Sequence, residues 1–246
     1  MASEELKLDY YFDPFCGWCY ASAPALDALA EAYPQALIMR PSGLFANTDR
    51  RPVSAMADHA WHHDQRIAKL TGQTFTTEYR DKILRNRDGI FDSICATRAI
   101  VALGETDRTL EPKVLHALQT ARYVEAQETS DAEVVAAIAA AVSREHGHPI
   151  DARVFADRLA NDQELAARTN QSIRETVARM SGRAGLGVPQ LLATVGVHRE
   201  VIHGADLYSG ANAVLTAIDA VKARASHTET SQPSNERHMT NKGDRP

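Results

Sequence analysis

The sequence has 246 residues, a formal net charge of −5 and 44% hydrophobic residues, which is enough apolar material for a buried core. The acidic balance is unlike that of a general nucleic-acid-binding protein, which is usually basic. No stretch approaches the roughly 20 apolar residues of a membrane span, and the acidic start at Met1 does not resemble a secretory signal. We therefore expect a cytoplasmic protein that binds neither nucleic acid nor membranes.

The first forty residues alternate between strand and helix patterns. Residues 6–12 form a short apolar and aromatic run, which predicts a buried strand that ends in a turn at Asp13. Residues 15–33 have helical spacing, with a kink expected at Pro24. A second apolar run at 36–39 predicts another strand. This order is typical of a parallel β-α-β unit.

The middle of the chain has a helical pattern, with almost no strand signal between about residues 54 and 181. The spacing of apolar residues predicts helices at 54–70, 76–85, 91–103, 112–126, 131–144 and 152–180. The last of these segments is expected to contain two helices that meet near 160–162. Such a block fits a helical insertion into a single fold and does not require a second sheet.

Strand signal returns near the end of the chain. Residues 188–195 and 197–202 predict a hairpin that turns at Gly196, and residues 208–223 predict a closing helix. From residue 226 onward no aliphatic core residue appears, so we predict a disordered tail over 226–246.

Two of the three cysteines form a close pair, Cys16 and Cys19, at the end of a predicted strand and the start of a predicted helix. Positions i and i+3 share a helix face, so the two sulfurs can meet. Because a helix N-terminus favours negative charge, we expect Cys16 to be the nucleophilic thiolate. Cys19 lies one turn further in and is expected to be the buried resolving thiol. The third cysteine, Cys95, is interpreted as a small buried apolar residue.

The residues around this pair suggest a substrate site. Gly17 would let a substrate backbone approach closely, while Phe15 and Trp18 would provide an apolar rim suited to extended peptide segments. Plain packing is the alternative interpretation for the aromatic side chains, and it carries equal weight for Phe15 and Tyr20.

A single C-x-x-C pair is also compatible with half of a zinc site or with an inert pair. Zinc needs two further ligands, and no second cysteine pair exists. His59 and His63 have a spacing that can bind zinc, but Ala60 stands where the zincin pattern has Glu. A solvated helix face is the favoured interpretation, and we expect no metal site.

The segment from Tyr11 to Tyr20, with the sequence YFDPFCGWCY, resembles the active-site segment of DsbA-family thioredoxin-like proteins, in particular their cytoplasmic bacterial branch. Gly187-Val188-Pro189 resembles the loop that carries the cis-proline of this superfamily. The resemblance implies an α/β thioredoxin-like fold with a large helical insertion. The corresponding domains are a thioredoxin-like domain over 1–50 and 183–225 and an inserted helical domain over 51–182.

The resemblance also implies roles for individual residues. Cys16 would be the nucleophile, Cys19 the resolving thiol and Pro189 a cis-proline facing them, with the Val188 backbone free to pair with a substrate strand. The family often has a buried carboxylate six residues before the first cysteine, where this sequence has Tyr10. Asp13 is the nearest candidate for the same proton transfer, although we favour a turn or cap role for it.

The predicted function is thiol–disulfide exchange by a DsbA-like protein disulfide oxidoreductase or isomerase. Its substrates would be protein, peptide or small-thiol compounds, its cofactor only the redox-active disulfide, and glutathione is a candidate co-substrate. Two alternatives stay open: a non-catalytic adaptor or stress-response partner, and a glutathione-dependent kappa-like transferase or isomerase. The kappa-like branch usually has Ser at the position of Cys16, which counts against it. We expect a monomer or weak dimer, and the direction of exchange is open.

Overall fold

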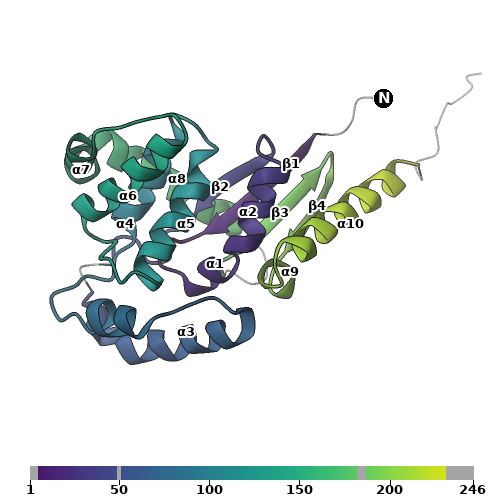
Figure 1. Cartoon of the computed structure of the whole chain (residues 1–246). Helices are drawn as coiled ribbons and strands as arrows, with labels where there is room; N and C mark the ends of the chain where they lie inside the picture. Colours follow the sequence, from purple (N-terminus) through teal and green to yellow (C-terminus); the bar gives the residue numbers. More distant parts are fainter. Residues whose placement is uncertain (1–4, 49–50, 182–186, 231–246) are drawn as a thin grey trace, which may run out of the picture.

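The computed structural model describes residues 5–48, 51–181 and 187–230, and its described strands form one mixed sheet (Figure 1). The strands are β1 (Leu6–Phe12), β2 (Leu37–Pro41), β3 (Gln190–Val195) and β4 (His198–Ile202). Their order in the sheet is β2-β1-β3-β4. β1 runs parallel to β2, with Leu8 opposite Leu37, and antiparallel to β3, with Tyr10 opposite Leu191. The predicted β-α-β start and the predicted hairpin are both present.

β1 lies at the centre of the sheet and is buried on both faces. Tyr10 and Phe12 point into the main core and are fully buried. Tyr11 points to the opposite face, where it packs with Leu192 of β3 and with Met180. The alternation follows from the two-residue period of a strand. The strand ends at Phe12, and the cysteine motif follows directly after it.

Four helices belong to the part of the chain that forms the sheet. They are α1 (Gly17–Ala21), α2 (Ala23–Ala32), α9 (Ala205–Tyr208) and α10 (Ala211–Thr230). Figure 1 shows α2 and α10 side by side over the same face of the sheet. The helix predicted over 15–33 is in fact two helices that meet at Ser22, and Pro24 lies in the first turn of α2, where a missing amide costs little.

The predicted start of the disordered tail at residue 226 is wrong. Helix α10 continues to Thr230, because its helical hydrogen bonding extends past the last aliphatic side chains used to predict its end. The rest of the predicted tail, residues 231–246, lies outside the described residues.

The middle of the chain is helical, as predicted. Its elements are the 3-10 helix η1 (Val53–Met56), α3 (Ala57–Thr71), the π-helical turn η2 (Tyr79–Leu84), α4 (Ile94–Gly104), α5 (Leu110–Tyr123), α6 (Ala132–Glu145), α7 (Ala152–Asn161) and α8 (Gln163–Met180). The side chain of Asp162 accepts the amides of Glu164 and Leu165, which starts α8 directly after α7. This cap explains why two helices meet at the predicted position.

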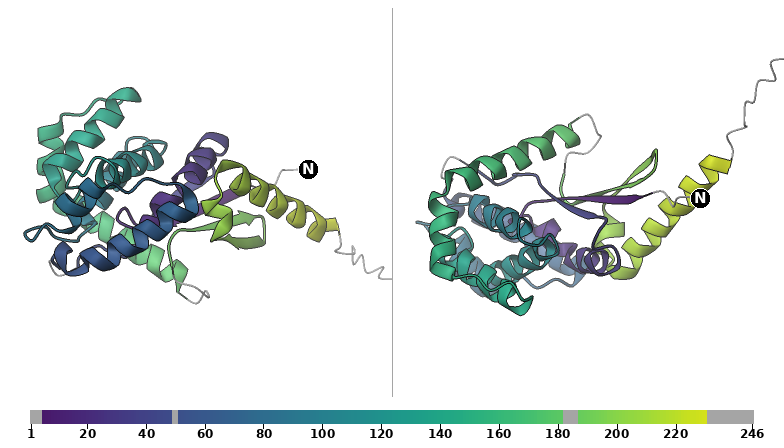
Figure 2. Two further views of the ribbon diagram at one scale, coloured as in Figure 1. Left: turned by 60° about the horizontal axis from the view of Figure 1, so that its bottom comes forward. Right: turned by 90° about the horizontal axis from the view of Figure 1, so that it is seen from above.

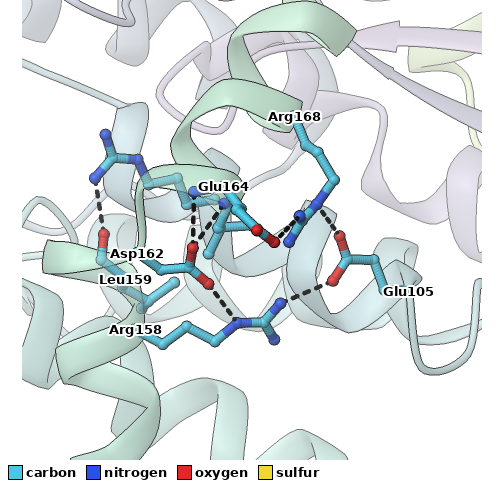
Figure 3. Close-up of polar contacts among 8 residues, drawn as sticks. Glu105, Arg158, Leu159, Asp162, Glu164 and Arg168 are labelled. Atoms are coloured by element: carbon cyan, nitrogen blue, oxygen red, sulfur yellow. Dashed lines mark hydrogen bonds and ion pairs between the residues drawn. The ribbon is translucent and has the colours of Figure 1, made fainter.

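Ion pairs on the surface connect the ends of α4, α7 and α8 (Figure 3). Glu105 accepts from Arg158 Nη2 at 2.8 Å and from Arg168 Nε at 2.6 Å. Arg158 Nε also donates to the capping residue Asp162 at 3.2 Å. These side chains are at least one quarter exposed, so each pair is expected to contribute about 1 kcal/mol or less.

The core is continuous across the two parts of the chain. One buried cluster includes Leu8 and Leu26 beside the sheet and Leu103 and Val135 in the helical block. Within this arrangement α3 lies beside α1, and Figure 1 shows it below the bundle of α4 to α8. Figure 2 shows the same elements from two further sides. The division into a thioredoxin-like domain and an inserted domain stays a prediction, and its boundary at 183 falls outside the described residues.

None of the helices in the described ranges combines the length and the apolar character that crossing a bilayer requires.

Candidate active site

The turn after β1 places the two cysteines at the start of α1. Cys16 is the N-cap residue of that helix, and its amide donates to the Asp13 carbonyl at 3.1 Å. Cys19 lies one turn further along, and its amide donates to the Cys16 carbonyl at 2.9 Å. Both cysteines are free thiols. Cys19 is only 1% exposed, whereas Cys16 is 6% exposed and lines a cavity. The two thiols therefore differ in access, as the sequence predicts.

The loop before β3 lies opposite Cys16. The Val188–Pro189 peptide bond is cis, and the Cys16 thiol donates to the Val188 carbonyl at 3.5 Å. Val188 also lines the cavity beside Cys16. The fold thus brings together residues that are 172 positions apart, as the comparison of sequence motifs suggested.

The environment of Cys19 disfavours its thiolate. Burial, followed by the neighbouring Cys16 sulfur, raises the pKa of the Cys19 thiol well above its ordinary value. The Asp13 amide donates to the Cys19 sulfur at 3.5 Å and opposes this shift, but does not overcome it. Cys19 therefore needs a proton acceptor before it can attack a mixed disulfide.

The carboxylate of Asp13 holds the turn in place. Its Oδ1 accepts the Phe15 amide at 2.9 Å, and its Oδ2 accepts the Phe45 amide at 2.9 Å and the Ser93 hydroxyl at 3.0 Å. This fits the turn role that we favoured. Burial raises the pKa of Asp13 to about 6, against the lowering effect of these hydrogen bonds. A carboxyl group with that pKa can also exchange protons near neutral pH.

Tyr10 occupies the position where the family often has a carboxylate, and it has a structural partner. Its hydroxyl lies 2.6 Å from the Ser22 hydroxyl, which in turn donates to the Cys19 carbonyl at 2.9 Å. Because Ser22 uses its hydrogen for that carbonyl, Tyr10 donates to Ser22. The pair fixes the junction of α1 and α2 behind the cysteines.

The cavity beside Cys16 has a volume of about 320 Å³. All four residues predicted to bind substrate line it: Phe15, Gly17, Trp18 and Val188. Its other walls are mostly apolar and come from α3, from the segment around Leu44 and from Phe91. The cavity is at the lower end of the range of about 300–1,000 Å³ that is typical of small-molecule sites.

Gly17 also has a steric role inside the protein. A Cβ at this position would lie 2.7 Å from Asp64 Oδ1 and 3.0 Å from Ile67 Cδ1. The space that a Cβ would take is therefore filled by two side chains of α3. Glycine allows α3 to pack directly against the residue that follows Cys16.

The aromatic side chains of the motif differ in whether they pack in the core or lie at the rim of the cavity. Phe15 is buried, and the guanidinium carbon of Arg122 lies 3.9 Å from its ring centre. Tyr20 stacks on Tyr123 inside the core and does not line the cavity. Trp18 is half-buried and packs against Tyr208, with ring centres 4.7 Å apart. Trp18 is therefore the motif aromatic with most access to the cavity.

Two charged residues at this site were missed by the sequence analysis, Asp64 and Arg122. Asp64 is only 6% exposed, lines the cavity and accepts a hydrogen bond from the Tyr79 hydroxyl at 3.2 Å. Burial raises the pKa of Asp64 to about 7, although Tyr79 and Arg122 act in the lowering direction. The spacing of Asp64 and Ile67 on one helix face was the available signal, because Ile67 marks the buried side of α3.

The other residues that the sequence analysis considered are the histidines of α3 and Cys95. His59 and His63 are on α3 with ring centres 4.4 Å apart, at the edge of the cavity. In the described ranges no cluster of three or more histidine, cysteine or acidic residues is arranged to hold a metal ion. Cys95 is buried in α4, and burial raises its pKa to about 12. A larger cavity of about 520 Å³ beside α5 and α6 contains no cysteine.

Comparisons with known proteins identify the family and the fold. The family profile described as DSBA-like thioredoxin domain matches residues 7–210. A cytosolic disulfide reductase, DsbM from Pseudomonas aeruginosa, is 27% identical with a TM-score of 0.67, over 92% of this chain and 100% of that one. The structure of DsbM with GSH is 28% identical with a TM-score of 0.66, over 91% and 99% of the two chains. No curated protein matches the sequence.

A further solved structure shows the same fold. A putative protein disulfide isomerase from Nitrosomonas europaea is 22% identical with a TM-score of 0.64, over 94% of this chain and 100% of that one.

The fold and the dithiol site define a thioredoxin-like thiol–disulfide oxidoreductase, with a mixed sheet and a large helical portion. The chain belongs to the DsbA-like thioredoxin domain family. The predicted family, fold class and exchange of thiols with disulfides are thereby confirmed. Neither the adaptor nor the kappa-like alternative has better support. The roles of the individual site residues stay predictions.

Proposed function

We propose that the protein is a cytoplasmic disulfide reductase that takes its electrons from glutathione. The observation that carries the proposal is the unequal placement of the two thiols, since Cys16 lines a small cavity and Cys19 is buried behind it. The similarity to DsbM, a cytosolic disulfide reductase with a structure containing GSH, supports the direction, the compartment and the reductant.

The proposed cycle begins at Cys16. Its thiolate attacks a substrate disulfide, forms a mixed disulfide and releases one substrate thiol. Cys19 then loses its proton and attacks the Cys16 sulfur, which releases the second substrate thiol and leaves a Cys16–Cys19 disulfide. One glutathione thiolate attacks the Cys16 sulfur, which releases Cys19 and leaves a Cys16–glutathione mixed disulfide. A second glutathione thiolate attacks the glutathione sulfur of this mixed disulfide, which releases Cys16 and gives oxidised glutathione and the free dithiol. In sum, one disulfide and two glutathione molecules give two thiols and one glutathione disulfide.

Two further residues have proposed roles in this cycle. The Val188 backbone, whose carbonyl already faces the Cys16 thiol, would pair with the substrate backbone next to Pro189. Asp13 would accept the proton of Cys19, because its charge is close enough to raise the pKa of that thiol.

The test is a glutathione-driven reduction assay in which oxidised glutathione is followed by its enzymatic reduction with NADPH. We expect wild type to be active, Cys16→Ser to have only the uncatalysed rate, and the control Cys95→Ala to match wild type. The reduction potential of the Cys16–Cys19 couple is expected within the cytosolic range of roughly −220 to −320 mV. A potential near about −120 mV, with faster oxidation of reduced proteins than reduction of disulfides, would overturn the proposal in favour of an oxidase.

A further inference from the structure

We propose that Asp64 binds the cationic amino group of the small thiol that occupies the cavity beside Cys16. The inference rests on the proposed glutathione-dependent activity and adds a residue that would determine which thiol is accepted. Asp64 comes from α3, 45 positions or more from the cysteine motif, and no feature of that motif requires it.

The two oxygens of the Asp64 carboxylate have different surroundings. Oδ2 accepts the hydrogen bond from the Tyr79 hydroxyl at 3.2 Å, which orients the group. Oδ1 lies against Gly17, where a Cβ would come within 2.7 Å of it. One oxygen is thus held from behind, while the other faces the backbone next to Cys16. This is the orientation that a fixed acceptor needs at the wall of a binding cavity.

Asp64 is the only acidic side chain among the described residues that line the cavity, so a cation there has no other acidic partner. Most of the lining side chains are apolar, including Trp18, Phe45 and Ile67, so a charge that enters is removed from water. An ionised acceptor in such surroundings makes a stronger hydrogen bond with a charged donor than it would in water. Asp64 therefore has the position and the chemistry to select a substrate that carries an ammonium group.

The size of the cavity restricts the occupant. A volume of about 320 Å³ suits a small molecule of a few residues and is too small for a folded protein segment. Cys16 and Asp64 line the same cavity, so the sulfur of the thiol can lie at Cys16 while its amino group lies at Asp64. Glutathione has both groups in one molecule of suitable size.

Other ionisable groups around Asp64 set the conditions for binding. The Tyr79 hydroxyl of η2 donates to the carboxylate, and the positive charge of Arg122 of α5, which is itself paired with Glu128, favours the ionised form. His59 and His63 line the cavity from the same helix, and Cys16 lines it from the motif. Burial raises the pKa of Asp64 to about 7, so the carboxylate is mostly ionised at pH 8 and mostly protonated at pH 6.

The test compares glutathione with N-acetylglutathione, which retains the thiol but lacks the cationic amino group. In wild type at pH 8 we expect kcat/KM for glutathione to exceed that for N-acetylglutathione by about tenfold or more, the size expected for one charge-assisted hydrogen bond. In Asp64→Asn the ratio should fall to about one. The matched control Asp58→Asn, an exposed position of α3, should keep the wild-type ratio.

A second measurement needs no variant. The wild-type preference should shrink at pH 6, because a protonated Asp64 carboxyl no longer carries the charge that attracts the ammonium group. A wild-type ratio near one at pH 8, or an Asp64→Asn ratio equal to wild type, would overturn the role of Asp64. If wild type reduced disulfides with dithiothreitol but with neither glutathione compound, the proposed glutathione dependence itself would be wrong.

Discussion

The cavity beside Cys16 has two walls of different origin. The motif wall consists of Phe15, Cys16, Gly17, Trp18 and Val188, and comes from the part of the chain that forms the sheet. The helical wall consists of Asp64, Ile67, Tyr79 and Phe91, and comes from the block between β2 and β3. The motif wall holds the Cys16 sulfur, whereas the helical wall holds Asp64, the only acidic side chain among the described residues that line the cavity. The comparison suggests that reactivity and substrate choice are supplied by separate regions of one fold.

The largest effect is expected from breaking the motif wall at Cys19. Cys19→Ser should lower turnover strongly, because the mixed disulfide on Cys16 can no longer be resolved within the protein and is released only by external glutathione. Mass spectrometry should then show Cys16 trapped with one substrate or glutathione adduct. Undiminished turnover in this variant would mean that external thiols resolve the intermediate, and that the buried position of Cys19 has no catalytic purpose.

The helical wall should affect the pH dependence of stability through Asp64. Its pKa is raised in the folded state from 3.8 to about 7, so the cost of the buried anion is absent below about pH 4 and complete above about pH 7. Asp64→Asn removes the cost of burying the anion, and the amide oxygen of the asparagine can still accept the hydrogen bond from the Tyr79 hydroxyl. The free energy of unfolding of the variant relative to wild type should therefore rise with pH across this window.

At about 1.4 kcal/mol for each pKa unit, the difference corresponds to at most roughly 4 kcal/mol. Chemical denaturation at pH 4.5, 6 and 8 measures it. Asp13 and Glu111, whose pKa values are also raised, titrate in both proteins and cancel in the comparison. A difference that does not change with pH would show that Asp64 is not buried as an anion.

The contact between the two walls can be tested at Gly17. Gly17→Ala places a methyl group against Asp64 Oδ1 and Ile67 Cδ1, and overpacking of this kind costs about 1–3 kcal/mol. The cost should be smaller in an Asp64→Ala background, because the shorter side chain leaves room for the methyl group. Equal costs in both backgrounds would show that α3 does not pack on the motif.

The smallest effect is expected far from both walls, at the ion pairs among α4, α7 and α8. Glu105→Gln removes the acceptor shared by Arg158 and Arg168, and should lower the free energy of unfolding by about 1 kcal/mol or less. The loss should decrease in high salt, because exposed charges are screened. Reductase activity should match wild type, and a marked loss would mean that the helical block influences the cavity over a long distance.

Local patterns in the sequence were sufficient to predict most of the helices and strands. The short apolar run at residues 6–12 predicted the central strand, and the helical pattern predicted two helices that meet near 160–162, where the structure has the Asp162 cap. Two helix boundaries differ from the predicted ones. The helix over 15–33 is broken at Ser22, whose hydroxyl bonds to the Cys19 carbonyl, and α10 extends beyond the apolar residues that marked its end. Polar residues can continue a helix that tertiary packing has already started.

The sequence by itself determined the reactive pair, because Cys16 and Cys19 are close in the chain and their helical spacing alone brings the sulfurs to one face. It also indicated Val188 and Pro189 through a resemblance of motifs. Only the tertiary structure showed that Asp64 and Tyr79 line the cavity beside Cys16, and that Arg122 packs against Phe15, another residue of the cavity wall. The spacing of Asp64 and Ile67 places them on one face of α3, but whether that face is buried depends on what packs against it, and only the fold decides this.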